Sequence, residues 1–161
     1  MYKRDRIKTA VLYIGGAAAV GSCLALILFF AYTLRLRTEY REVCLQINDA
    51  ILASDEASNW VRRGEDIAPL SGRALDYYDK FLLDANTVVF NRRVRDITDG
   101  SIQLVIGENT LALTGCGDGT EIHIRWETPG ALTCYSVRNT TTSFLHLSAY
   151  LDNYIRSLET P

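Results

Sequence analysis

A serine, a histidine and a glutamate are predicted to meet on two neighbouring strands near the C-terminal end of the chain. Glu121 and His123 alternate along one strand, and the predicted register places Ser136 opposite His123. Hydrolases combine a hydroxyl nucleophile, a base and an orienting acid in this way. We expect these groups on a solvated sheet face, which offers no cleft and no oxyanion donors. The sequence therefore favours cross-strand polar pairs over catalysis, and predicts no enzyme.

Cys134 and Arg125 continue this polar face by one position. They add no recognisable cofactor chemistry, because the chain has no CxxC or HxxxH spacing for a metal ion. A phosphate loop and a dinucleotide fingerprint are also absent. We therefore predict no metal site and no cofactor.

The strands that position these groups lie between Ile102 and Arg138. Turn signals at 107–110, 117–120 and 128–131 separate four segments of alternating polarity, which predict a four-stranded antiparallel meander. Folding the chain at these turns places the apolar residues on one face, whereas a one-residue shift would reverse each set. The predicted opposite pairs are Ile106–Leu111, Leu104–Leu113, Leu113–Ile124, Leu111–Trp126, Ile124–Tyr135 and Ile122–Val137.

Helices are predicted both before and after this meander along the chain. Apolar residues at steps of three and four predict one long helix over about 9–63, a second over 71–85 and a third over 142–158. A short strand is favoured at 87–90. The long helix and the C-terminal helix are available to cover the apolar face of the meander. The predicted fold class is therefore α+β, with helices on one face of an antiparallel sheet.

The longest apolar run of the chain is Thr9–Leu34, which holds 26 residues without a charge. A helix of this length reaches about 39 Å, enough to cross a hydrocarbon core of about 30 Å with some tilt. The sequence predicts a tail at 1–8, a transmembrane helix at 9–34, a helical stalk and connection at 35–70 and an α+β domain at 71–161. The bilayer is thus the first expected partner.

Charge predicts the orientation of this segment. Four Lys and Arg residues lie in the first eight positions, whereas Arg35, Arg37 and Arg41 alternate with glutamates. The positive-inside rule therefore predicts a cytoplasmic N-terminus and an extracytoplasmic domain at the cell membrane. From Arg35 onward, the chain has 13 Lys and Arg residues and 18 Asp and Glu residues. This net negative charge argues against a nucleic-acid partner. The cationic cluster at 91–95 is predicted to be a solvated edge, with membrane-surface or partner contact as the alternative.

A lipoprotein is an alternative reading of the apolar segment. Val20-Gly-Ser-Cys23 resembles a lipobox, and lipid on Cys23 would anchor the domain. The apolar sequence nevertheless continues from Leu24 to Leu34, so that cleavage would discard half of a full-length span. Both readings predict a membrane anchor.

Small residues recur at intervals of four along the predicted span. This small-xxx-small spacing lets two helix backbones approach closely in lipid, although Gly and Ala are also common in unpaired membrane helices. We expect a helix partner, either a second copy or another membrane protein. The residues concerned are Gly15 and Ala19, and Ala17, Gly21 and Ala25.

Three cysteines lie outside the predicted span, and their pairing is open. Cys116 and Cys134 share the polar face of the meander on its second and fourth strands. The predicted register places their Cα atoms roughly 16 Å apart, whereas a disulfide needs less than about 7 Å. We therefore do not expect Cys116 and Cys134 to be bonded to each other, since a 116–134 disulfide would require another register. Cys44, Cys116 and Cys134 are each a possible free thiol or disulfide partner.

These elements predict a single-pass membrane protein that acts as a non-catalytic assembly or interaction subunit of a cell-envelope complex. A ligand-sensing membrane regulator is an alternative, but the short tail at 1–8 would have to signal through a membrane partner. A pilin-like subunit is another. The half-embedded N-terminal helix, the connection and the meander, with Asn109–Thr114 and Asp118–Ile122, resemble the layout of type IV pilins and minor pseudopilins. That resemblance implies a subunit of a pilus or secretion apparatus, whereas the basic leader lacks the closing Gly and the early Glu of that family.

Overall fold

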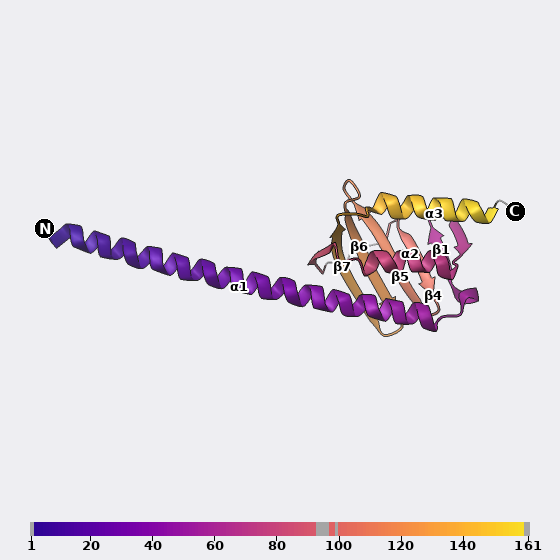
Figure 1. The fold of residues 1–161 in the computed structure, drawn as a ribbon, viewed down its shortest axis with the longest axis horizontal. Helices are drawn as coiled ribbons and strands as arrows, with labels where there is room; N and C mark the ends of the chain where they lie inside the picture. The colour runs from indigo at the N-terminus through magenta and orange to yellow at the C-terminus, as the bar shows by residue number, and fades with distance from the viewer. Residues whose placement is uncertain (1, 93–96, 99, 160–161) are drawn as a thin grey trace. The chain divides into compact units, whose positions relative to one another are not determined.

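The computed structural model describes residues 2–92, 97–98 and 100–159, with side chains described from Tyr13 onward. The chain divides into two compact units, Met1–Arg35 and Leu36–Pro161. Helix α1 (Tyr2–Ala53) forms the described part of the first unit and opens the second. The second unit adds a sheet and further helices, so that the fold is α+β (Figure 1).

In the first unit, α1 carries apolar side chains that face outward. Every side chain from 13 to 32 is exposed, including Phe29 (66%) and Phe30 (65%). Among the described residues, α1 is the one helix whose length and composition suit a membrane crossing. A water-soluble surface rarely exposes so large an apolar patch.

The long helix ends at Ala53, and its predicted extension to Arg63 is wrong. A short 3₁₀ turn (Glu56–Ser58) follows, and the Asp55 side chain caps it by accepting a hydrogen bond from the Ala57 amide. Asp, Ser and Asn side chains compete for backbone hydrogen bonds in this way and end helices. Beyond the turn the chain is extended, because an aromatic and a β-branched residue, Trp60 and Val61, suit a strand.

The sheet has seven strands rather than the four predicted, and every pair of neighbours is antiparallel. Their order across the sheet is β2-β1-β4-β5-β6-β7-β3. The additional strands are β1 and β2, which fill the predicted connection, and β3, where the sequence favoured a short strand. The strands are β1 (Trp60–Arg63), β2 (Asp66–Pro69), β3 (Thr87–Asn91), β4 (Ile102–Ile106), β5 (Asn109–Cys116), β6 (Glu121–Thr128) and β7 (Ala131–Asn139).

Two of the three predicted hairpin registers are observed. Leu113 lies opposite Ile124, and Ile124 lies opposite Tyr135. The first hairpin differs by two residues, because Leu104 pairs with Leu111 instead of Leu113. Its turn uses only two residues, 107–108, with φ +58° at Gly107. A two-residue shift keeps every side chain on its face, so the error left the apolar pattern intact.

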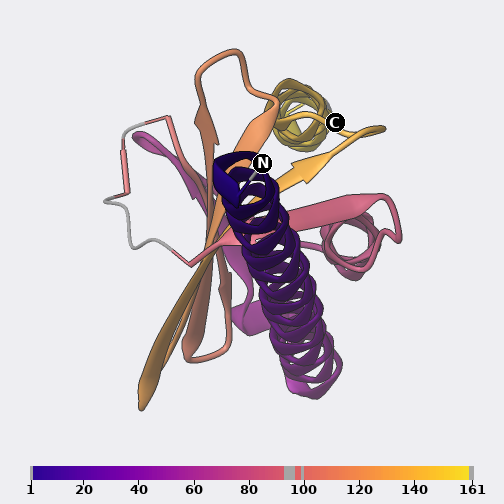
Figure 2. The ribbon, with the colours of Figure 1, turned by 90° about the vertical axis from the view of Figure 1, so that its left-hand side faces the viewer.

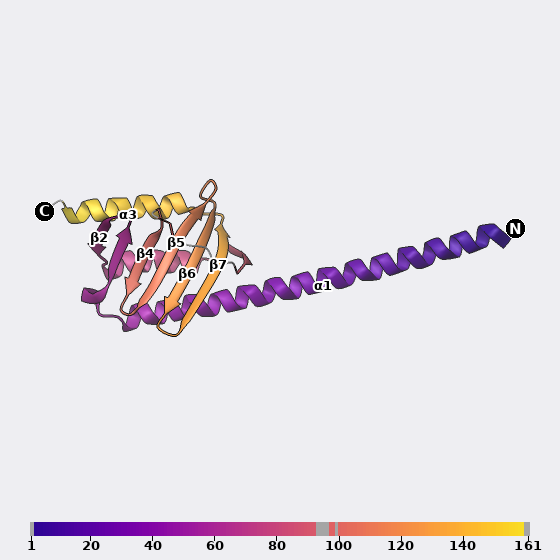
Figure 3. The same ribbon diagram turned by 180° about the vertical axis from the view of Figure 1, so that it is seen from behind.

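Two more helices complete the second unit. Helix α2 (Gly72–Leu82) begins after Ser71, whose hydroxyl accepts a hydrogen bond from the Ala74 amide, and ends three residues before the predicted boundary. Helix α3 (Phe144–Glu159) is the predicted C-terminal helix, shifted by one or two residues. Figure 2 shows α2 and α3 on the same side of the sheet, and Figure 3 shows the opposite face with its strands in front.

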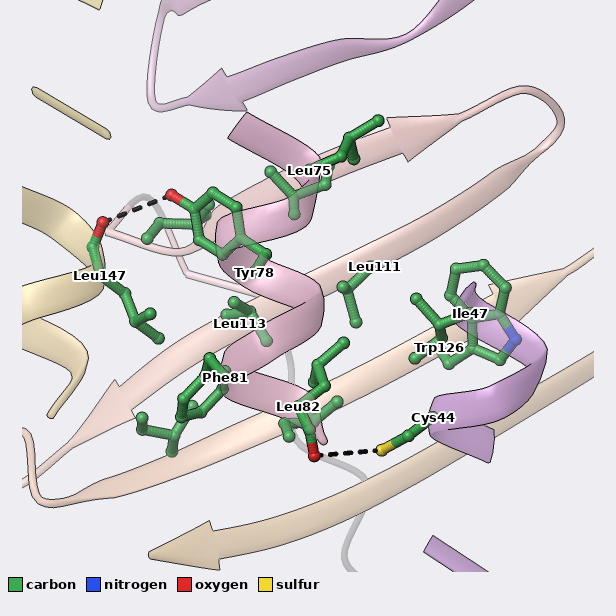
Figure 4. Packing of buried hydrophobic residues seen from close by; sticks show 14 of the residues in the cluster. Cys44, Ile47, Leu75, Tyr78, Phe81, Leu82, Leu111, Leu113, Trp126 and Leu147 are labelled. Atoms are coloured by element: carbon green, nitrogen blue, oxygen red, sulfur yellow. Dashed lines mark hydrogen bonds between the residues drawn. The ribbon is translucent and has the colours of Figure 1, made fainter. Parts of the chain in front are cut away.

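The second unit has one apolar core, built from α1, α2, α3 and one face of the sheet. Ile47 of α1 packs near Leu111 and Trp126, and Tyr78 of α2 donates a hydrogen bond to the Leu147 carbonyl of α3 at 3.3 Å (Figure 4). Each fully buried side chain of this size contributes about 1.5–3 kcal/mol relative to exposure. Residues 36–53, predicted as part of a stalk, are therefore a core element of the domain.

A glycine allows the beginning of α3 to approach β5. A Cβ atom at Gly115 would lie 2.6 Å from Phe144 Cγ and 2.9 Å from Phe144 Cβ. These atoms belong to a ring held at the helix start, so the neighbour has little room to shift. The packing of α3 on the sheet therefore requires a residue without a side chain at this position.

Replacing Gly115 by alanine is expected to lower the free energy of unfolding by about 1–3 kcal/mol, because the added methyl group overpacks the contact with Phe144. Urea unfolding of the full chain in detergent micelles, followed by tryptophan fluorescence, measures the change. Gly130→Ala is the matched control, since its Cβ would meet nothing within 4 Å. Equal stability of the two variants would contradict the close approach.

Candidate functional site

The structure brings together the serine, histidine and glutamate that the sequence pointed out. His123 lies opposite Ser136 on β7, as predicted. Ser136 Oγ and His123 Nδ1 share a hydrogen bond of 2.6 Å, and His123 Nε2 lies 3.2 Å from Glu121 Oε1. The three side chains thus form one contiguous polar group, on the face of the sheet opposite to the core residues Ile122 and Ile124.

This group is buried, contrary to the expectation of a solvated face. Ser136 has no exposed surface, and His123 is 5% exposed. The neighbouring positions Ala112 and Cys134 are buried as well. Both faces of the central strands are therefore desolvated, which the alternation of polar and apolar residues does not reveal.

The polar group belongs to a row of residues on four neighbouring strands, β5, β6, β7 and β3. Thr114 of β5 and Ser136 of β7 flank His123, and Asn91 of β3 pairs with Ser136. At the other end, Ser101 Oγ lies 2.6 Å from Thr114 Oγ1. The sequence offered no signal for the two ends, because they come from segments outside the predicted hairpins.

The geometry of this row differs from that of a hydrolase site. A nucleophilic hydroxyl has to reach its substrate, whereas Ser136 is fully enclosed. Glu121 is only partly buried and lies beside His123 on the same strand. Chemically, the row pairs buried side chains such as Ser136 and His123, because a buried polar atom costs about 1–3 kcal/mol when unpaired. At its end, Asn91 Oδ1 is buried without a hydrogen-bond partner among the described residues.

Arg125 and Cys134 lie opposite each other at the next position on this face, and they also differ from a catalytic pair. Arg125 Nη2 forms an ion pair of 2.9 Å with Glu127. Burial raises the pKa of the Cys134 thiol above its ordinary value, although the nearby Arg125 opposes this shift. The thiol is therefore protonated near neutral pH, which makes it a poor nucleophile and a poor metal ligand.

The four cysteines are all thiols in the structure. Cys116 and Cys134 lie on β5 and β7, with β6 between them. Cys44 is buried on α1, where its Sγ donates to the Leu82 carbonyl at 3.5 Å (Figure 4). Desolvation raises the pKa of Cys44 to about 12, so this thiol is inert at neutral pH. Cys23 is exposed on the first unit.

The small residues of the predicted helix contact are exposed. All five of them, Gly15, Ala17, Ala19, Gly21 and Ala25, lie on the described surface of the first unit. A Cβ atom at either glycine would meet nothing within 4 Å. This part of α1 therefore has room for the backbone of another helix.

A pocket that the sequence did not indicate lies in the second unit, between α1 and the connection from α2 to β3. Its cavity volume is about 400 Å³. No local pattern could have revealed it, because its walls are about 40 positions apart in the chain. The lining residues are Arg37, Tyr40, Arg41, Cys44, Leu45, Leu82, Leu83, Asp84, Ala85 and Thr87.

Hydrogen bonds fix the walls of this pocket. Tyr40 Oη donates to the Leu82 carbonyl at 3.1 Å, and the Cys44 thiol donates to the same carbonyl at 3.5 Å. These two bonds join α1 to the end of α2. Arg37 Nη2 donates to the Ala85 carbonyl at 3.4 Å. Burial raises the pKa of Tyr40 above its ordinary value, so its hydroxyl remains a donor at neutral pH.

Asp84 is held by hydrogen bonds on the far side of the pocket wall. Asn139 Nδ2 and Thr141 Oγ1 each donate to its Oδ2 at 2.9 Å. The Asn86 amide donates to Oδ1 at the same distance. These bonds, first of all that from Asn139, lower the pKa of the carboxyl below its ordinary value. Asp84 therefore stays ionised and oriented by its donors.

The predicted cationic cluster at 91–95 is described only at its start, because 93–96 lie outside the described residues. Arg92 Nη1 forms an ion pair of 2.8 Å with Glu39, and its guanidinium lies 5.4 Å from the centre of the Tyr135 ring. This cation therefore joins the end of β3 to α1 by an ion pair while its side chain stays about half exposed (49%). The prediction for the rest of the cluster lies outside the described residues.

Comparisons with known proteins do not supply a function, so a functional proposal has to be based on the geometry of the structure. No protein-family model, no curated protein and no solved structure matches this chain. Among the described residues, no three His, Cys, Asp or Glu side chains gather where they could hold a metal ion.

The Ser136–His123 hydrogen bond is expected to stabilise the sheet. Ser136→Ala removes one partner of a buried imidazole and should lower the free energy of unfolding by about 1–3 kcal/mol. The control is Ser157→Ala, which removes a hydrogen bond from an exposed position and should change stability by less than about 0.5 kcal/mol. Urea unfolding in micelles compares the two, and equal values would mean that the row contributes nothing.

Proposed function

We propose that this chain is a single-pass membrane protein that presents its α+β domain outside the cell membrane as a non-catalytic assembly or interaction subunit of an envelope complex. The observation that carries the proposal is the exposed, charge-free apolar surface of α1 in the first unit. Such a surface is stable when lipid surrounds it.

Charge supports the orientation, since the basic residues at 1–8 favour a cytoplasmic N-terminus. The second unit begins at Leu36, immediately after the first. Neither Gly nor Pro occurs between Ser22 and Arg63 to provide a flexible linker. An anchor joined so directly to a domain core suits a part that has to be held close to a membrane assembly.

The non-catalytic part of the proposal rests on the buried polar row. Ser136 is enclosed, and the Cys134 and Cys44 thiols have raised pKa values. The three candidate nucleophiles Ser136, Cys134 and Cys44 are therefore inaccessible or inert as they stand. An interaction role needs none of them.

A pilin-like subunit is the second candidate. The observation in its favour is that residues 36–47 of α1 pack in a core with an antiparallel sheet, which is the layout that the resemblance implies. Removal of a leader by a prepilin peptidase would separate the two candidates. The intact mass of the chain purified from membranes should remain 18.0 kDa if the first candidate holds.

The orientation predicts how cysteine reporters behave in intact cells. In a variant without native cysteines, Gly130→Cys places a thiol on an exposed turn, and Lys3→Cys places one in the tail. A membrane-impermeant maleimide is expected to label position 130 at once and position 3 only after permeabilisation. The reverse pattern would place the domain in the cytoplasm, and labelling of both without membrane association would reject the anchor.

Helix association in the bilayer is the second part of the proposal. Cys23 follows Gly15 and Ala19 at the same spacing of four, so it lies on their stripe and reports on that face. We expect copper-phenanthroline oxidation of membranes to yield a disulfide-linked dimer. Gly15→Ile with Ala19→Ile should reduce the yield roughly tenfold, which corresponds to about 1.4 kcal/mol, because the larger side chains keep the two backbones apart.

Gly16→Ile is the matched control for this crosslinking, because it adds the same side chain off the stripe. Cys23→Ser should abolish the product. A crosslinked species of another mass, lost in Cys23→Ser, would identify a different membrane partner. If wild-type membranes give no crosslinked species, this face of α1 is not a helix contact.

A further inference from the structure

We propose that the pocket between residues 37–45 of α1 and the α2–β3 connection binds the phosphate of an anionic membrane phospholipid. This inference rests on the proposed membrane anchoring and adds a ligand to it. Its cavity of about 400 Å³ falls within the range of small-molecule sites, which is about 300–1,000 Å³.

Two guanidinium groups give the pocket its positive charge. Arg37 and Arg41 are one helical turn apart on α1, and both are exposed and line the cavity. Arg37 uses one nitrogen for a long hydrogen bond of 3.4 Å to the Ala85 carbonyl. In the described part of the structure, Arg41 has no hydrogen bond or ion pair. A guanidinium carries five donors in a fork that fits phosphate oxygens, so most of these donors remain available.

The carboxylate among the lining residues does not neutralise these cations. Asp84 is directed toward Asn139, Thr141 and Asn86, which donate to both of its oxygens. Its lowered pKa means that it keeps its negative charge at neutral pH, while its hydrogen bonds hold both oxygens toward these donors. With two arginines against one aspartate, the lining carries a net charge of +1 and offers both guanidinium groups to an incoming anion.

Apolar side chains beside the arginines indicate an amphipathic ligand in place of a free anion. Leu45 is 48% exposed and Leu83 is 41% exposed, and both line the cavity. A hydrated inorganic phosphate gains nothing from two exposed leucines. A phospholipid does, because its glycerol and first methylene groups cover them while its phosphate contacts the arginines.

The place of the arginines in the sequence matches the headgroup layer. Arg37 and Arg41 follow Leu34, the last residue of the proposed span, by only three and seven residues. A bilayer that holds Thr9–Leu34 therefore keeps its phosphate groups within a few residues of these arginines along the chain.

The test uses the full chain in nanodiscs that contain equal amounts of phosphatidylglycerol and phosphatidylcholine. Native mass spectrometry of the released protein counts the lipids of each kind that stay bound. Wild type is expected to retain phosphatidylglycerol preferentially, and Arg37→Gln with Arg41→Gln should reduce that preference about tenfold. The control is Arg62→Gln with Arg73→Gln, which removes the same charge from exposed positions outside the pocket.

A second variant separates binding from folding and from bulk charge. Leu45→Gln changes an exposed pocket residue without touching either arginine or the net charge, and it should also lower the preference while the thermal unfolding midpoint stays the same. Equal retention by wild type and both pocket variants would overturn the proposal. So would an equal loss in the control pair, which would mean a nonspecific charge effect.

A separate arm distinguishes lipid from free phosphate. Inorganic phosphate, added to the detergent-solubilised chain, is expected to leave the unfolding midpoint unchanged, whereas short-chain phosphatidylglycerol should raise it in wild type only. An equal rise with both ligands would assign the pocket to a free anion and overturn the lipid assignment. If the chain does not enter nanodiscs at all, the membrane anchoring itself fails, which is a different result from insertion without lipid preference.

Discussion

The domain depends on the burial of one stripe of α1 in the second unit. Leu36, Tyr40, Cys44 and Ile47 are each at most 5% exposed, so residues that continue directly from a membrane-type helix are also the first layer of the core. Two of these side chains are polar, and both donate to the Leu82 carbonyl. A buried donor without a partner would cost about 1–3 kcal/mol, so this pair fixes the end of α2 against α1. The pocket is lined by the same residues, Tyr40, Cys44 and Leu82, at this junction.

The second face of the sheet imposes a complementary constraint. The row from Ser101 to Asn91 places hydroxyl, imidazole and amide groups where water is excluded. Apolar packing tolerates small displacements, whereas hydrogen bonds between side chains on adjacent strands do not. A shift of β6 by two residues would preserve the apolar face and still separate His123 from Ser136. The polar row therefore selects one register among those that the apolar face allows.

Much of this architecture was readable in the sequence, and the exceptions have physical causes. The meander of β4 to β7 was predicted because its strands alternate and their turns contain glycine, and only the turn at Gly107 proved shorter than expected. Strands β1 and β2 were missed because four residues are too few for a period, and Val61 continued a helical spacing. The neighbours His123 and Ser136 followed from register, but their burial did not. The pocket was invisible because its two walls meet only after the chain has folded.

The early position of the buried α1 stripe in the chain also affects folding during synthesis. Residues 36–53 leave the ribosome before every strand that covers them, and β7, which pairs with both β6 and β3, comes almost last. At about 5–20 residues per second, the remaining hundred or so residues take on the order of 5–20 s to appear. Throughout that interval a nascent chain exposes a row of large apolar side chains that only its later strands will cover. The stripe is thus the longest-exposed part of the core during synthesis, because the core begins so early in the chain.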